Sequence, residues 1–367
     1  MLRQENYLSF IQRVEKSEFI ICIGAGQRLQ RLEEIFEKKE LLKKVRYVAD
    51  NALEKQGTEV NVGNKKIVVQ SVESLIPVLK KQITVIITCL YYYDVLEQLN
   101  NIEAFDKTDI FLLTYILGDY CDSKALKKEI PPDLRIADEI LIPKVIHYCW
   151  FGGNPIPDRY QEWMRSWKKY CPDYEIVEWN ESNYDFSKNQ YMLNAYEQKK
   201  WGFVPDYARL DIIYNYGGIY LDTDVELIKN IDDLLYQRGF VGFESGQYVN
   251  LGIGFGAVAG NTYIKEMRDA YDNYTFVDEQ GQINLTASPV YQTQFLLKKG
   301  LKLNGEYQVL EGEMTVFPEK MLSGKSLVSR KINLSTYTRA IHHFDGSWLD
   351  DDKRKMNLRI ENDMNNG

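Results

Sequence analysis

The sequence has few of the features that mark membrane, secreted or nucleic-acid-binding proteins. No apolar run approaches the roughly 20 residues that a membrane-spanning helix needs, and the first residues lack the apolar segment of a signal peptide. The 45 basic residues are outnumbered by 53 acidic residues, for a net charge of -8. Since general nucleic-acid binding needs a clustered basic surface, this balance argues against a nucleic-acid partner.

Cysteine and histidine are scarce. The 5 cysteines include no C-x-x-C pair, and Cys22, Cys89 and Cys149 lie in apolar runs, in which a free thiol packs as a small hydrophobe. This usage fits a reducing compartment, so we predict a cytoplasmic protein and leave peripheral binding at the inner face of the membrane open. With only 3 histidines in the chain, the adjacent pair His342-His343 is noticeable.

At 367 residues the chain is long for one compact core, which favours two domains. In the first third, nearly continuous apolar runs alternate with helical patterns, as is typical of a parallel sheet covered by helices on both faces. We therefore predict a Rossmann-like α/β domain over residues 1–140. Its strands are expected near 19–23, 45–49, 66–69, 84–88 and 110–113, and its helices near 6–14, 29–39, 74–81 and 92–99.

A charged segment with two adjacent prolines, residues 127–136, is the best candidate for a linker. The α/β pattern then resumes, so we predict a second α/β domain over residues 141–350, followed by a polar tail over residues 351–367. Elements of the second domain are expected at 144–148, 160–169, 175–179, 204–216, 218–221, 290–298 and 339–344.

Two carboxylates, Asp222 and Asp224, follow directly on an apolar strand of this second domain. In α/β sheets ligands bind beyond the carboxyl ends of strands. Paired carboxylates are hard oxygen ligands that suit Mn²⁺ or Mg²⁺, and such an ion can neutralise the diphosphate released during sugar transfer. An Asp-x-Asp pattern alone is weak, because the polar run Asp350-Asp351-Asp352 also matches it and an acidic surface turn is the ordinary explanation.

A helix upstream strengthens the case for a site. Asp206 and Arg209 lie three residues apart in the predicted helix 204–216 and share one of its faces. Directed at a ligand, the carboxylate accepts hydrogen bonds from sugar hydroxyls and the guanidinium donates to diphosphate or sugar oxygens. The alternative is a surface ion pair, which contributes only about 0.5 kcal/mol.

These residues resemble glycosyltransferase family 32. The resemblance is carried by Asp206-x-x-Arg209 together with Gly217-Gly218-Ile219-Tyr220-Leu221-Asp222-Thr223-Asp224, by residues 142–150, which are similar to the opening strand of the family, and by residues 340–348, which are similar to its C-terminal motif. The family includes yeast-type initiating mannosyltransferases and bacterial capsule or exopolysaccharide enzymes, and the glucosylating domains of large clostridial toxins share its core. The first 140 residues lie outside the resemblance.

The resemblance implies a GT-A fold and transfer with retention of anomeric configuration. It also implies a set of roles. Asp224 is expected to bind the metal directly, Asp222 to contact the metal, ribose or sugar, and His343 to be the third metal ligand. The implied donor-binding residues are Asp206 and Arg209 for the sugar, Trp150 for the base, and Ser347 and Trp348 for the diphosphate. Asn250, at the start of a glycine-rich run, is a further candidate for hydrogen bonding to the donor sugar.

Ordinary structural explanations stay open for several of these residues. Neighbouring side chains on a strand point to opposite faces, so at most one histidine of the pair is expected to reach the site. His147 is more often a satisfied core histidine than a ligand, and Trp150 is as compatible with core packing as with base stacking. Asn250 can equally be a turn residue.

The first domain suggests a rival class of function. Gly24-Ala25-Gly26 follows a strand and Asp50 ends the next one, as in dinucleotide-binding enzymes. An NAD(P)-dependent oxidoreductase or epimerase acting on nucleotide sugars is therefore an alternative, although Leu29 occupies the third glycine position of the fingerprint. A structural, acceptor-positioning or degenerate dinucleotide-binding role is the other interpretation of this domain. A catalytically silent sugar-nucleotide binder is a third possibility.

From the sequence we predict a metal-dependent, retaining glycosyltransferase. It moves a hexosyl group from a nucleotide sugar, with UDP-sugars favoured, to a glycan or lipid-linked glycan acceptor in bacterial surface polysaccharide synthesis. The oligomeric state is not predicted.

Overall fold

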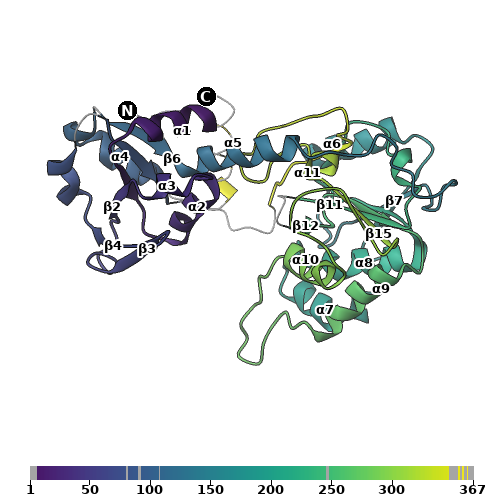
Figure 1. The fold of residues 1–367 in the computed structure, drawn as a ribbon. Coiled ribbons are helices and arrows are strands. Elements are labelled where there is room, and N and C mark those ends of the chain that lie inside the picture. The colour runs from purple at the N-terminus through teal and green to yellow at the C-terminus, as the bar shows by residue number, and fades with distance from the viewer. Residues whose placement is uncertain are drawn as a thin grey trace. The chain divides into compact units, whose positions relative to one another are not determined.

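The computed structural model describes residues 6–79, 82–89, 92–106, 108–244 and 248–346, together with residues 354, 355, 358 and 362. Contacts divide the chain into two compact units, which comprise Met1–Ser123 and Lys124–Asn362 and are described separately (Figure 1). The division falls before the boundary near residue 140 that the sequence suggested.

Unit 1 is built on a six-stranded sheet with the order β3-β4-β2-β1-β5-β6. All neighbouring strands are parallel except β3 and β4, which form an antiparallel hairpin. The strands are β1 (Ile20–Ile23), β2 (Val45–Ala49), β3 (Glu59–Val62), β4 (Lys65–Gln70), β5 (Thr84–Ile87) and β6 (Asp109–Leu112). The helices are α1 (Tyr7–Lys16), α2 (Leu32–Ile35), α3 (Lys39–Leu42), α4 (Tyr92–Asn100) and α5 (Leu113–Leu126), with 3₁₀ helices η1 (Gln27–Arg31), η2 (Glu73–Val78) and η3 (Glu103–Phe105).

Burial explains why these segments form a parallel sheet. Every residue of β1 and of β5 is buried, as expected for strands whose two faces are both covered. The predicted helix over 29–39 is wrong as one element: the chain leaves the helical conformation at Phe36, whose ring packs against Phe10 of α1. The predicted helix over 74–81 is a 3₁₀ helix instead, and it contains Pro77, which has no N–H to donate.

Unit 2 contains an eight-stranded mixed sheet, in which β14-β15-β11-β13-β9-β7-β8 follow one another and β12 pairs with β11. A separate two-stranded sheet joins β10 and β16. The strands are β7 (Val145–Cys149), β8 (Glu175–Trp179), β9 (Gly218–Tyr220), β10 (Val225–Leu227), β11 (Gly239–Phe243), β12 (Val249–Asn250), β13 (Phe255–Ala257), β14 (Gln308–Leu310), β15 (Met314–Phe317) and β16 (Ala340–His342). The helices are α6 (Asp158–Tyr170), α7 (Gln190–Glu197), α8 (Pro205–Tyr216), α9 (Thr262–Asp269), α10 (Ser288–Lys298) and α11 (Glu319–Leu322), with η4 (Phe186–Lys188), η5 (Asp232–Leu234) and η6 (Ala270–Asn273).

Helices cover both faces of this larger sheet. Consecutive residues of a strand point to opposite faces, and accordingly Tyr220 packs in one apolar cluster with α7 and α8, whereas Ile219 packs in a second cluster with Trp167 of α6. Figure 1 shows α7 to α10 on one side of the strands and α6 and α11 on the other. The predicted α/β class is therefore confirmed. In the described part of the chain, no helix combines the length and apolar character needed to span a membrane.

His147 lies in the core of this unit, on β7. Its Nδ1 accepts a hydrogen bond from Trp179 Nε1 at 3.1 Å, and its Nε2 donates to the carbonyl oxygen of Gly217 at 3.0 Å. Burial lowers the pKa of this histidine to about 4, so the ring is neutral near pH 7. The neighbouring Gly218, at φ 98°, has no room for a side chain, because a Cβ there would lie 2.9 Å from the Val145 carbonyl oxygen and 3.0 Å from His147 Nε2.

The neutral state of His147 makes stability depend on pH. The unfolded chain protonates this histidine near pH 6.5, whereas the folded protein resists protonation down to about pH 4. The contribution of His147 is therefore complete above pH 6.5 and decreases as the pH falls, by about 2 kcal/mol between pH 7 and pH 5. We expect the free energy of unfolding of the wild type to fall by that much more than that of His147→Gln over this range.

Urea unfolding followed by tryptophan fluorescence measures this difference, because all 6 tryptophans lie in the second unit. Parallel pH profiles for the two proteins would contradict the neutral, buried histidine.

Candidate active site

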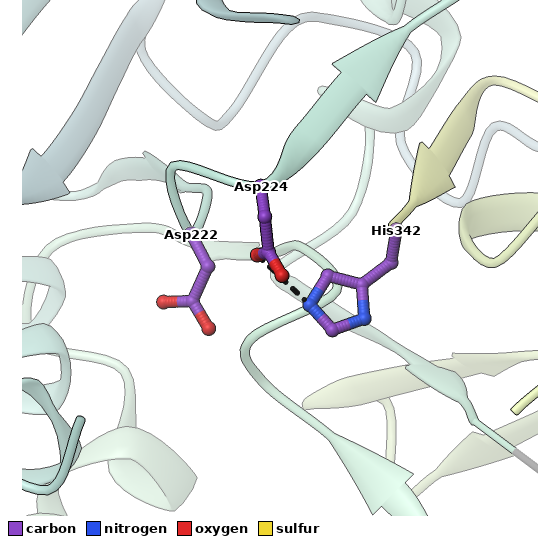
Figure 2. Close-up of side chains that lie close together, drawn as sticks. All are labelled: Asp222, Asp224 and His342. Carbon is purple, nitrogen blue, oxygen red and sulfur yellow. Dashed lines mark ion pairs between the residues drawn. The ribbon is translucent and has the colours of Figure 1, made fainter. Parts of the chain in front are cut away.

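The two aspartates of the acidic motif lie in the turn that follows β9. β10 begins at the next residue, Val225, and pairs in antiparallel fashion with β16, so that Val225 lies opposite His342. This pairing brings His342 Nε2 to 3.1 Å from Asp224 Oδ1. Figure 2 shows the imidazole facing Asp224, with Asp222 on the other side of that carboxylate. One ligand atom from each of Asp222, Asp224 and His342 lies within 4.8 Å of the others.

His343, the predicted third metal ligand, points elsewhere. Its Nε2 lies 2.9 Å from Glu226 Oε2, and its ring stacks on Trp163 with 4.0 Å between centroids and an angle of 9° between the ring planes. Neighbouring side chains at the end of a strand face opposite ways, and the register with β10 directs the first histidine toward Asp224. The structure therefore brings His342, and not the predicted His343, beside the two aspartates.

Charge and burial act against each other at Asp224. Burial disfavours its ionised form, but the adjacent His342 and the backbone N–H of Asp345 outweigh that effect and lower the pKa of Asp224 to about 2. His342 is itself desolvated, yet the acids around it raise its pKa. The Nδ1 atom of this imidazole is buried and has no hydrogen-bond partner among the described residues.

Arg209 connects α8 to the acidic motif. Its Nη2 lies 3.1 Å from Asp206 Oδ1 and 3.6 Å from Asp222 Oδ1, and its guanidinium carbon lies 5.1 Å from the centroid of the Tyr220 ring. Asp206 and Arg209 are both 3% exposed, which excludes the surface ion pair that the sequence left open. Burial raises the pKa of both Asp206 and Asp222, although the guanidinium acts in the opposite direction. The arginine thus lies between the buried Asp206 and the partly exposed Asp222.

Asn250 is held on β12 by bonds within the protein. Its Oδ1 accepts a hydrogen bond from the backbone N–H of Gly252 at 2.6 Å, and its Nδ2 donates to Glu244 Oε1 at 2.9 Å. Glu244 is a buried carboxylate that the sequence did not single out, and charges on His342 and Arg330 act on it. Its position directly after the apolar strand β11 was the signal that could have identified it.

The remaining predicted donor-binding residues lie beside or beyond this cluster. Trp150 is partly buried, donates from Nε1 to the Asn154 carbonyl oxygen at 2.6 Å and packs edge-on against Tyr160. Ser347 and Trp348 lie outside the described residues.

Just before them, Asp345 connects the C-terminal segment to the acidic motif. Its backbone N–H donates to Asp224 Oδ2 at 3.1 Å, while its carboxylate accepts hydrogen bonds from Arg159 and Tyr160 of α6. The helix α6 therefore holds the segment that contacts Asp224.

The crowding at Gly252 leads to a prediction. A Cβ at this position would lie 2.3 Å from Asp222 Oδ2 and 3.2 Å from Arg209 Nη1, so Gly252→Ala must displace the carboxylate. We expect Mn²⁺ affinity, measured by isothermal titration calorimetry, to fall by about tenfold, as is usual when a metal-site residue is misplaced. Gly26→Ala is the control, because a Cβ at Gly26 meets nothing within 4 Å. Unchanged Mn²⁺ affinity in a folded Gly252→Ala protein would show that Asp222 is not needed in the metal site.

Comparison with known proteins places this site in a recognised sequence region. A family model described as "Glycosyltransferase sugar-binding region containing DXD motif" matches residues 157–241. "Inositol phosphoceramide mannosyltransferase 3" of Schizosaccharomyces pombe is 38% identical over 104 residues, which are 27% of this chain and 29% of that protein. "Mannosyl phosphorylinositol ceramide synthase SUR1" of Saccharomyces cerevisiae is 29% identical over 173 residues, 45% of this chain and 44% of that one. The chain thus spans less than half the length of these curated relatives.

Two solved glycosyltransferases show distant similarity. "PaToxG Glycosyltransferase" gives a TM-score of 0.36 at 21% identity, covering 49% of this chain and 74% of that one. A glycosyltransferase involved in glycosylation of the major capsid of PBCV-1 gives a TM-score of 0.35 at 12% identity. The match covers 59% of this chain and 100% of that one. TM-scores this low do not establish a common fold. The sequence match to the family model, in contrast, covers both α8 and the acidic motif.

Proposed function

We propose that this protein is a metal-dependent glycosyltransferase that moves a hexosyl group from a nucleotide sugar to a hydroxyl of a glycan or lipid-linked glycan. The observation that carries the proposal is the convergence of Asp222, Asp224 and His342 beyond the carboxyl end of β9. Ligands of α/β proteins bind at that edge.

The donor set of this cluster fits a divalent cation. Two carboxylates and one imidazole suit Mn²⁺, and carboxylates also suit Mg²⁺. Asp224 is ionised at neutral pH because its pKa is held near 2. When bound, the cation supplies positive charge that stabilises a departing diphosphate. Asp222, Asp224 and His342 are the residues that would hold it.

In this proposal the buried pair on α8 binds the donor sugar. Arg209 lies within 3.6 Å of Asp222, so a sugar bound beside the metal site can meet both a guanidinium donor and the acceptor oxygens of Asp206. The carboxylates around Arg209 can also stabilise positive charge that develops on the sugar as its bond to the diphosphate breaks. Retention of anomeric configuration is a proposal that rests on the resemblance to family 32.

The family resemblance and the names of the relatives suggest different donors and acceptors. UDP-sugars and a glycan of a bacterial surface polysaccharide follow from the family resemblance. The names of the relatives favour mannose as the sugar and a phosphoinositol lipid as the acceptor. Both acceptors present a hydroxyl, and we propose a cytoplasmic reaction in either case.

Slow donor hydrolysis tests the proposed function without knowledge of the acceptor. We expect release of nucleotide from at least one of a panel of UDP-sugars and GDP-mannose in the presence of Mn²⁺, and loss of release on addition of EDTA. Asp224→Asn should lower the rate by at least about a hundredfold, the usual effect of removing an electrostatic contact from a charge-stabilising site. Asp133→Asn, at an exposed position of the same unit, is the matched control. Equal rates in wild type and Asp224→Asn would refute the proposed metal site.

The two histidines provide a second test. We expect His342→Ala to weaken Mn²⁺ binding by at least about tenfold, whereas His343→Ala should bind Mn²⁺ as the wild type does, because His343 faces Glu226 and Trp163. Titration followed by the electron paramagnetic resonance signal of free Mn²⁺ measures both affinities. The reverse order of effects would contradict the observed register of β16.

A further inference from the structure

The sheet of unit 1 has a point at which its winding reverses. From β1, the chain adds β2 and β4 on one side, and then β5 and β6 on the other. The reversal therefore lies between β1 and β5. In open parallel sheets, ligands bind beyond the carboxyl ends of the strands at such a point.

The glycine loop after β1 is not arranged for a dinucleotide. Asp50 Oδ2 accepts the backbone N–H of Ala25 at 2.7 Å, so the carboxylate occupies a donor that a pyrophosphate would use. The same carboxyl group also accepts from Ala52 and Lys55. Beyond Gly26 the chain forms the short 3₁₀ helix η1 and then the four-residue helix α2. The Asp50 carboxylate therefore stabilises the glycine loop, and its oxygens are engaged by the protein itself rather than being available to a ribose.

Arg28, on η1, extends across the end of β5. Its Nη2 donates to Thr114 Oγ1 at 2.9 Å, and Thr114 lies in the first turn of α5, directly after β6. Since β5 lies between β1 and β6, these two residues bracket the end of β5. Burial raises the pKa of Cys89, which follows β5, and the nearby Arg28 acts in the opposite direction.

The Arg28 guanidinium carries a positive charge without a carboxylate partner. Among the residues that the structure describes, Arg28 forms no salt bridge, and its Nε is buried without a hydrogen bond. The nearby Glu34 is engaged by Arg31 through two hydrogen bonds of 2.8 Å. A partly desolvated cation with unused donors is unfavourable until an anion completes its bonds.

We propose that Arg28 and Thr114 bind a phosphate group at the winding reversal of unit 1. The guanidinium can donate two parallel hydrogen bonds to phosphate oxygens and the Thr114 hydroxyl can add a third. The phosphate belongs to inorganic phosphate or to a small phosphate monoester. This site is independent of the proposed transferase site.

Phosphate titration of the whole chain in EDTA tests the proposal, since EDTA removes metal-dependent binding elsewhere. We expect binding by isothermal titration calorimetry, and slower amide hydrogen exchange in peptides that cover residues 24–31 and 109–117 but not in those that cover 218–227. Arg28→Gln should weaken binding by at least about tenfold, the effect of losing a charge-assisted hydrogen bond. Arg46→Gln removes an exposed arginine of the same unit and should bind as the wild type does.

Thr114→Val is a second, nearly isosteric variant. It tests the proposed phosphate site even if Arg28→Gln does not fold. Weaker phosphate binding by Thr114→Val supports the site. Absence of protection at 24–31, or wild-type affinity in folded Arg28→Gln or in Thr114→Val, would overturn it. A second titration with uridine monophosphate identifies the source: tighter binding at the same peptides assigns a phosphate monoester, and equal or weaker binding assigns inorganic phosphate.

Discussion

The pairing of β10 with β16 is the contact on which the candidate active site depends. It places His342 beside Asp224 although the two residues are more than a hundred positions apart, and it is reinforced by the His343 N–H, which donates to the Asp224 carbonyl oxygen at 2.9 Å. Because side chains alternate along a strand, a shift of one residue in this pairing would exchange the two histidines. The register therefore decides which histidine lies beside Asp224.

Around that contact, basic side chains lie beside the acids of the site on two sides. Asp222 faces Arg209, and Asp224 faces His342, while the two carboxylates destabilise each other's ionised forms. Asp222 also lies so close to Gly252 that a Cβ there would be 2.3 Å from Asp222 Oδ2. A divalent cation between the carboxylates would relieve their repulsion, and this supports the proposed metal dependence more directly than the acidic motif alone.

The sheet of unit 1 shows that strand order alone does not determine which ligand binds at a sheet edge. Its sheet is wound in both directions from β1 and a glycine loop follows β1, yet Asp50 is bonded to the loop itself. Arg28, which has no carboxylate partner among the described residues, extends across the end of β5 to Thr114. A fold of this kind thus indicates where a ligand can bind, and the side chains at that edge decide which one.

The sequence by itself determined the elements that carry the acidic motif. The helix α8 and the strand β9 were predicted within a residue or two, because an apolar helical pattern, two glycines and a short apolar strand are signals between near neighbours in the chain. The parallel sheet of unit 1 followed from its continuous apolar runs in the same way. The hairpin strand β3 and the helix α5 were missed, since β3 is only partly buried and α5 begins at the residue after β6 with no turn between them.

Only the tertiary structure decided which side chains meet. The exchange of His343 for His342, the burial of the Asp206–Arg209 pair, the contact of Glu244 with Asn250 and the capping of the glycine loop by Asp50 all join segments that are separated along the chain or depend on what covers them. A local pattern specifies which face of an element is apolar. It does not specify the register between distant strands or the solvent that a charged group loses on folding, and those two quantities determine the chemistry of the site.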